Sequence, residues 1–185
     1  MQIITLNVNG VRAAKKKGFL QWLTQQPADV VCIQELKAQL PDLPSDIQAP
    51  DGYHSYFHCA ERKGYSGVGI YCRNQPDNII EGVGIEQIDN EGRFLQADFG
   101  NLSIISIYLP SGSSGDHRHA SKVFFMEKFF PLLETMMASK RDIILCGDWN
   151  IAHHEIDLKN WRANQNRPFH FFPLNETLIP IVLST

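Results

Sequence analysis

The sequence has no long apolar run and no cysteine pair at metal-binding spacing. Its apolar stretches fall well short of the roughly 20 residues that a membrane-spanning helix needs. The first nine residues lack the basic and apolar parts of a secretory signal, so we expect a cytoplasmic protein. The four cysteines are predicted to be reduced core residues, because none forms a C-x-x-C pair. They are Cys32, Cys59, Cys72 and Cys146.

Excess positive charge is also missing. The 17 basic residues are outnumbered by 20 acidic ones, which gives a net charge of −3 and a pI near 6.1. This balance argues against a protein that coats nucleic acid through bulk positive charge, although a local basic face could still bind a polyanion. With 185 residues, 43% hydrophobic and 20% charged, the chain predicts one soluble globular domain.

Short runs rich in β-branched residues alternate with helical patterns, which indicates an α/β or α+β fold. Apolar residues recur at helical spacing over about Ala13–Gln26 and about Ala120–Ser139, and Pro131 predicts a kink or break in the second helix. The stretch from about Ala163 fits neither period and receives no element. The predicted strands are Gln2–Asn7, Asp29–Glu35, Gly67–Arg73, Arg93–Phe99, Leu102–Leu109 and Asp142–Gly147. The predicted loops are Pro41–Pro50, Arg62–Gly67 and Ser111–Asp116.

Polar side chains stand where four of the predicted strands end. Asn7, Glu35 and Tyr108 lie at three of these ends, and Asp148 follows the last strand, with Asn150 two residues later. Asp148 and Asn150 face the same way if the extended course continues, because strand side chains alternate between faces. If the strand ends lie side by side, two carboxylates, two amides and a phenol converge. Such oxygen ligands suit Mg²⁺ or Mn²⁺ rather than zinc, and the natural substrate partner of such an ion is a phosphate.

Each of these residues alone has a simpler explanation. Gly-Asp-x-Asn after a strand is more often a turn, in which Asp and Asn bond their own backbone. Glu35 alone is more often a surface residue, Tyr108 a half-buried aromatic residue, and Asn7 a cap for the next helix. The functional interpretation therefore depends on the four strand ends occurring together.

The histidines and the basic residues are weaker indicators. His117, His119, His153 and His154 have H-x-H and H-H spacings, but no third ligand is recognisable, so surface positions are favoured over zinc binding. A basic cluster next to Asn7 is usually a solvated face, but beside a site it would lie where a polynucleotide backbone could be held. The cluster contains Arg12, Lys15, Lys16 and Lys17, and Arg62 adds charge on a loop. The candidate DNA contacts are Arg12, Lys15, Lys63, Tyr65 and Arg118.

Six stretches resemble the exonuclease III family of abasic-site endonucleases, within the endonuclease/exonuclease/phosphatase superfamily, and occur in that family's order. They are ITLNVNGVRAA (4–14), ADVVCIQELK (28–37), GYSGVGIYCR (64–73), GRF (92–94), IYLPSG (107–112) and ILCGDWNIAHHEIDLKN (144–160). The set covers about residues 1–163 and is specific as a whole, whereas any one stretch is weak. The N-V-N-G-x-R-A and G-D-x-N-x-A-H-x-x-x-D segments favour the DNA-repair branch over sphingomyelinase and inositol-phosphatase relatives.

The resemblance implies a four-layer α/β/β/α sandwich with the site at one rim. It implies that Glu35 is the principal metal carboxylate with Asn7 adjoining it, and that Asp148, also a metal ligand, orients and deprotonates the attacking water. Asn150 would hold the scissile phosphate or the metal, and Tyr108 would hydrogen-bond the phosphate. The implied cofactor is Mg²⁺, with Mn²⁺ as a substitute. The implied protein is a monomer that acts on double-stranded DNA with abasic sites or 3′-blocked ends.

The sequence departs from the family after about residue 164. The family's R-I-D-Y stretch and its terminal S-D-H, which carries the remaining catalytic Asp-His pair, are absent. We therefore expect a truncated catalytic domain over residues 1–164, with the sandwich incomplete at its C-terminal side. We expect the 165–185 tail to arise from a shifted reading frame or a truncated gene. One positioned acid or base contributes roughly 10²- to 10⁴-fold, so we expect impaired turnover.

Two alternatives stay open. One is a duplex-DNA-binding fragment without catalysis, which predicts salt-sensitive binding and no nicking. The other is a metallophosphoesterase that acts on a small or lipid phosphodiester and is indifferent to DNA.

Overall fold

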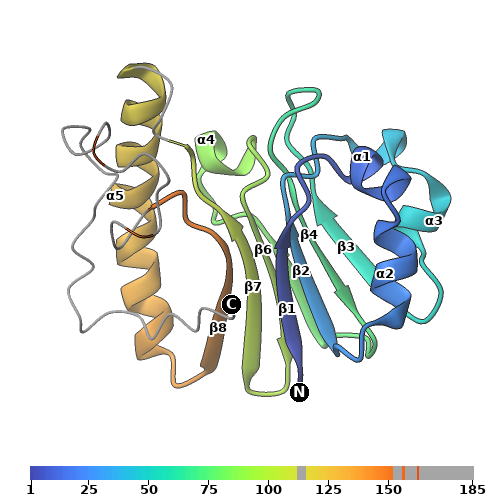
Figure 1. Ribbon diagram of the computed structural model, residues 1–185. Helices are drawn as coiled ribbons and strands as arrows, with labels where there is room; N and C mark the ends of the chain where they lie inside the picture. Colours follow the sequence, from blue (N-terminus) through green and yellow to red (C-terminus); the bar gives the residue numbers. More distant parts are fainter. Residues whose placement is uncertain (112–115, 152–155, 157–161, 163–185) are drawn as a thin grey trace.

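Two four-stranded sheets face each other, and helices cover the outer face of each sheet (Figure 1). The computed structural model describes residues 1–111, 116–151, 156 and 162. The layers follow the order α/β/β/α, which confirms the predicted sandwich. Within the described residues, no helix combines the length and the apolar character that crossing a bilayer requires.

The first sheet has the strand order β1-β2-β4-β3. β1 and β2 run parallel, whereas β4 is antiparallel to both β2 and β3. α1 and α2 pack on the outer face of this sheet through an apolar cluster that includes Val11, Leu23 and Ile33. The elements of this half are β1 (Ile3–Asn7), α1 (Val11–Lys16), α2 (Phe19–Gln25), β2 (Val30–Gln34), η1 (Leu40–Asp42), α3 (Ser45–Gln48), β3 (His54–His58) and β4 (Val68–Cys72).

The second sheet has the order β5-β6-β7-β8, with β7 and β8 parallel and the other pairs antiparallel. α5 covers its outer face, where Phe125 and Phe129 are buried against Ile105 and Ile107. The elements of this half are β5 (Asn78–Glu81), α4 (Glu86–Asp89), β6 (Phe94–Phe99), β7 (Leu102–Tyr108), α5 (Asp116–Ala138) and β8 (Asp142–Asp148).

The two parallel pairs place four carboxyl ends at one rim of the sandwich. Asn7 at the end of β1 pairs with Gln34 at the end of β2, and Tyr108 at the end of β7 pairs with Asp148 at the end of β8. β1 and β8, each at the edge of its sheet, also contact each other. The topology therefore brings the polar strand ends to the same place.

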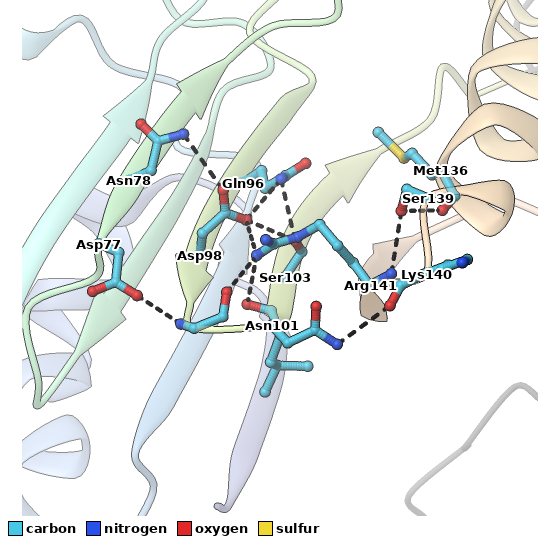
Figure 2. Close-up of polar contacts among 12 residues, drawn as sticks. Asp77, Asn78, Gln96, Asp98, Asn101, Ser103, Met136, Ser139, Lys140 and Arg141 are labelled. Atoms are coloured by element: carbon cyan, nitrogen blue, oxygen red, sulfur yellow. Dashed lines mark hydrogen bonds and ion pairs between the residues drawn. The ribbon is translucent and has the colours of Figure 1, made fainter.

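A polar network fixes the opposite end of β8 (Figure 2). Asp98 accepts hydrogen bonds from Ser103 Oγ at 2.6 Å and from Gln96 Nε2 at 2.8 Å, and Arg141 lies 3.3 Å from it. Arg141 Nε also donates to Ser103 Oγ at 2.9 Å. Burial acts to raise the pKa of Asp98, but these hydrogen bonds and the Arg141 charge outweigh it, so the pKa lies below its usual value. This network ties the start of β8, through Arg141, to β6 and β7.

All six predicted strands are present to within about a residue at each end, and two further strands escaped prediction. β3 carries two histidines in five residues, and β5 is a four-residue strand with three exposed positions, so neither has a clear period-2 pattern. All four cysteines are free, as predicted, and three of them are buried.

The helix predictions need three corrections. The stretch Ala13–Gln26 is not one helix but two, α1 and α2, because Gly18 between them adopts a left-handed conformation with φ 95°. α5 begins at Asp116 and continues through Pro131 without a break. The predicted loop Pro41–Pro50 contains the end of η1 and the whole of α3.

Candidate active site

The polar strand ends meet in one hydrogen-bonded group that joins the two sheets. Asn7 Nδ2 donates to Glu35 Oε1 at 3.0 Å and to Asp148 Oδ2 at 2.9 Å. Tyr108 donates its hydroxyl to Glu35 Oε1 at 2.9 Å. Residues up to 141 positions apart in the sequence thus touch. The structure places the four strand ends together as expected, while their chemical roles stay predictions.

Glu35 is held in place by a strained turn at the end of β2. Its φ is 61°, a left-handed conformation that is uncommon for residues other than glycine and that concentrates at functional sites. Gly10 N donates to the Glu35 carbonyl at 2.7 Å, and Leu36 N donates to the Gly67 carbonyl at 3.1 Å. A Cβ on Gly67 would lie 2.9 Å from Leu36 Cβ, so this close approach requires glycine.

Glu35 is a carboxylate with little contact with solvent, since its side chain is 15% exposed. Burial acts to raise its pKa, but hydrogen bonds from Asn7, Lys37 and Tyr108, together with the Lys37 charge, lower the pKa below its usual value. Lys37 Nζ lies 2.5 Å from Glu35 Oε2. The group is therefore ionised at neutral pH. Lys37 was missed as a site residue, although it lies only two positions after Glu35.

Tyr108 remains a protonated hydrogen-bond donor. Burial raises the pKa of its hydroxyl, and the hydrogen bond to Glu35 raises it further. Arg93, which is 1% exposed, contacts both the backbone and the ring of Tyr108. Its Nη1 donates to the Tyr108 carbonyl at 2.9 Å, and its guanidinium lies 5.0 Å from the centre of the Tyr108 ring. Arg93 stands in the GRF stretch, but sequence reasoning gave it no role.

The turn after β8 corrects one expectation. β8 ends at Asp148, and Asn150 adopts φ 49°, so the extended course does not continue and the two side chains do not share a strand face. Instead Asn150 N donates to Asp148 Oδ1 at 2.9 Å, and Asn150 Nδ2 donates to the Leu109 carbonyl at 2.8 Å. The turn interpretation of this motif is therefore correct, and the role of Asp148 and Asn150 in the site stays a prediction. Asn7, in contrast, is not the cap of α1, because that position belongs to Gly10.

Lys122 on α5 is a further residue beside the site that sequence reasoning missed. It is 2% exposed, and its Nζ donates to the Asn150 carbonyl at 2.5 Å. Desolvation lowers the pKa of Lys122 to about 8, although the charge of Asp148 acts in the opposite direction. Lys122 stands three and seven residues before the buried Phe125 and Phe129, so helical spacing places it on the apolar face of α5. This spacing was the sequence signal that could have identified Lys122 as a buried residue.

The site has the donor chemistry of a hard-cation site. Glu35 Oε1 and Asp148 Oδ2 both point at one amide nitrogen of Asn7, so two carboxylate oxygens face a common point. Such oxygen donors favour Mg²⁺-like cations over zinc. Across the part of the chain that the structure describes, no three His, Cys, Asp or Glu side chains form a metal-binding cluster.

Basic residues from α1 and from the turn after β2 lie beside this group. Arg12, Lys16 and Lys37 line a pocket of about 340 Å³ together with Gly10, Ala13 and Leu36. Of the other candidate DNA contacts, Lys15 forms an ion pair with Asp46 at 2.6 Å, and Lys63 is exposed.

Tyr65 connects the loop before β4 to Arg93. The Tyr65 hydroxyl accepts a hydrogen bond from Arg93 at 2.8 Å, and the Arg62 guanidinium lies 5.3 Å from the centre of the Tyr65 ring. The remaining predictions concern the side chains of His117, Arg118 and His119 and the residues His153 and His154, and these lie outside the described part of the chain.

Comparison with known proteins supports the family resemblance. The model of the endonuclease/exonuclease/phosphatase family matches residues 4–181, and the predicted boundary at residue 164 lies within this match and stays a prediction. The chain is 40% identical over 168 residues to an exodeoxyribonuclease of Bacillus subtilis, with 90% of this chain and 65% of that protein covered. It is 38% identical over 171 residues to the DNA repair nuclease APEX1 of Danio rerio, with 89% and 54% covered.

A solved structure shows the same fold. An AP endonuclease from Archaeoglobus fulgidus superposes with a TM-score of 0.80 at 26% identity, covering 94% of this chain and 66% of the other. The chain therefore spans between about half and two thirds of the length of these relatives.

Proposed function

Because the chain belongs to the endonuclease/exonuclease/phosphatase family, in its exonuclease III-like branch, we propose that it is a DNA-repair phosphodiesterase. In this proposal it depends on Mg²⁺, with Mn²⁺ as a substitute, and acts on double-stranded DNA. It nicks the strand on the 5′ side of an abasic site and removes nucleotides or blocking groups from 3′ ends. We further propose a cytoplasmic monomer.

One observation carries this proposal: the Asn7 amide lies between Glu35 and Asp148, with Tyr108 bonded to the same Glu35 oxygen. Carboxylate oxygens and a phenol donor are the groups that a phosphodiester reaction needs side by side. Glu35, Asn7, Asp148 and Asn150 would hold the cation. When bound, the cation neutralises negative charge that develops on the phosphoryl oxygens.

In this proposal each of the other side chains of the site has a separate role. Tyr108 donates a hydrogen bond to a phosphoryl oxygen, because its raised pKa keeps the hydroxyl protonated. Asp148 orients the attacking water and accepts its proton, while the turn to Asn150 holds the carboxylate through Oδ1. Asn150 contacts the scissile phosphate. Water then attacks phosphorus in line, and the 3′-oxygen leaves. Preformed donors of this kind contribute by stabilising charge that appears only in the transition state.

The DNA backbone is proposed to lie along the basic pocket beside α1. Arg12, Lys16 and Lys37 supply positive charge close to Glu35, whereas the overall charge of the chain is −3. Binding should therefore depend on a few local phosphate contacts and weaken as salt increases. Arg12, Lys63, Tyr65 and Arg118 stay candidate DNA contacts. Lys15 contributes only if its ion pair with Asp46 opens.

A nicking assay on a duplex with one abasic-site analogue tests the proposal. The protein is compared with Glu35→Gln and with Glu134→Gln, a control on the exposed side of α5, each with and without Mg²⁺. We expect Mg²⁺-dependent nicking that Glu35→Gln abolishes and Glu134→Gln retains. A rate that neither Mg²⁺ nor the Glu35 substitution changes contradicts the proposal.

The same assay separates the two alternatives. Salt-sensitive binding of the duplex without nicking identifies a DNA-binding fragment that does not turn over. Equal hydrolysis of a simple phosphodiester and of the abasic duplex identifies a phosphoesterase without DNA specificity.

A further inference from the structure

We propose that Lys122 is a positioning residue that holds the turn from Asp148 to Asn150 in the conformation that the site requires. The inference rests on the proposed function for the role of that turn. Lys122 itself is shielded from solvent and lies behind the site, so it acts through Asn150 and not on the substrate.

The burial of Lys122 needs a compensating interaction. An ammonium group removed from water costs several kcal/mol unless it is hydrogen-bonded. The buried side chains that follow Lys122 on the same face of α5 are apolar, among them Phe125 and Phe129, and Leu or Met would fill such a position at lower cost. The hydrogen bond to the Asn150 carbonyl is the interaction that a lysine makes here and that an apolar residue cannot make.

Asn150 is bonded through three different groups to three different parts of the fold. Its carbonyl accepts from Lys122 on α5, its N–H donates to Asp148 Oδ1, and its side-chain amide donates to the Leu109 carbonyl after β7. Its left-handed φ of 49° is strained, so it persists only while the surroundings hold it. Asp148 in turn presents Oδ2 to Asn7. Lys122 therefore stabilises the conformation of Asn150, and Asn150 in turn positions the carboxylate of Asp148.

The expected effect of removing the Lys122 donor follows from the strength of its hydrogen bond to the Asn150 carbonyl. Losing a hydrogen bond from a charged donor shifts a local equilibrium by about tenfold to a hundredfold. Lys122→Met keeps the length and the apolar stem of the side chain and removes the donor. Lys122→Gln keeps a neutral donor. Lys128→Met, at an exposed position of the same helix, is the matched control.

Amide hydrogen exchange on the full chain measures how well the turn is protected from solvent, and it does not depend on enzymatic activity. We expect Lys122→Met to speed exchange of the Asn150 amide by about tenfold or more, with Leu145 in β8 changed by less than about twofold. Lys122→Gln should restore most of the protection, and Lys128→Met should leave it unchanged. Urea unfolding of each variant measures global stability in parallel.

Kinetics on the abasic duplex provide a second measurement. If the chain nicks DNA, Lys122→Met should lower kcat by about tenfold or more with little change in KM, because the turn acts on the reacting phosphate and not on the flanking duplex. If the unsubstituted chain does not nick, the proposed function fails, and the exchange data still decide the role of Lys122.

Two results would overturn the inference. One is an exchange rate of the Asn150 amide in Lys122→Met that equals the rate in the wild type. The other is a uniform loss of protection along β8 together with a lower urea midpoint, which would make Lys122 a residue of general stability.

Discussion

Replacing Gly147 with alanine tests how β7 and β8 approach each other just before the site. Gly147 pairs with Ile107 in the parallel ladder. A Cβ at Gly147 would lie 1.9 Å from the Ile107 carbonyl oxygen and 2.7 Å from Ile107 Cγ2, whereas ordinary contacts begin near 3.4 Å. The oxygen belongs to the backbone, so no side-chain rotation relieves the clash and the strands must separate.

The expected destabilisation combines two effects. Overpacking of a tight interior costs about 1 to 3 kcal/mol. Strand separation also weakens the hydrogen bond from Leu109 N to the Asp148 carbonyl, now 2.9 Å long, and a bond of this kind contributes about 1 kcal/mol. We therefore expect Gly147→Ala to lower the free energy of unfolding by about 3 kcal/mol, a large share of the roughly 5 to 15 kcal/mol that stabilises a typical domain.

Urea unfolding followed by tryptophan fluorescence provides the measurement, with Gly100→Ala as the control. A Cβ at Gly100 meets no atom within 4 Å, and only its φ of 56° opposes alanine, which costs about 1 to 2 kcal/mol. Gly147→Ala should therefore be the less stable variant by about 1 to 2 kcal/mol. If Gly147→Ala proves as stable as Gly100→Ala, the steric argument is wrong.

Three further changes test the electrostatics of the fold. The lowered pKa of Glu35 means that its carboxylate stabilises the fold above the pKa of the unfolded state, and that this stability is lost as the pH falls through the folded value. Urea titrations from about pH 6 to about pH 3 should therefore show a smaller pH-dependent loss for Glu35→Gln than for the wild type, and an equal loss would contradict the assignment. Arg93→Met leaves the buried Tyr108 carbonyl without its guanidinium donor and should lower the unfolding free energy by about 3 kcal/mol, whereas a change below about 1 kcal/mol would count against a supporting role. Arg141→Met breaks the network around Asp98 and should lower it by about 1 to 2 kcal/mol in a calorimetric scan, against no change for Lys140→Met at an exposed neighbouring position.

Local pattern predicted the strands well and the helix boundaries less well, for identifiable reasons. Continuous runs of apolar and β-branched residues mark β2, β4 and β7, which are buried along nearly their whole length. β5 could not be found in this way, because its four mostly exposed residues become a strand only by pairing with β6. The break between α1 and α2 depends on the positive φ of Gly18, which the apolar spacing on both sides of it concealed.

For the site, the sequence predicted which groups meet but not what supports them. Asn7, Glu35, Tyr108 and Asp148 were singled out because each stands at or just after the end of an apolar run. That these ends lie side by side was an assumption, and the two parallel strand pairs of the structure show that it holds. Lys37, Arg93 and Lys122 escaped notice because their importance depends on burial and on partners distant in the sequence. Arg93 and Lys122 look like ordinary surface residues until their exposures of 1% and 2% are known.

Composition and periodicity, which act locally along the chain, predicted an α/β or α+β fold, reduced cysteines and oxygen-bearing side chains at the strand ends. The four-layer sandwich was implied by the family resemblance. Only the tertiary structure decided that two carboxylates from different sheets share one amide hydrogen-bond donor and that Asn150 turns away from the strand direction. It also decided that a buried lysine supports that turn. These features depend on distances between residues far apart in the sequence, and such distances are set when the two sheets pack against each other.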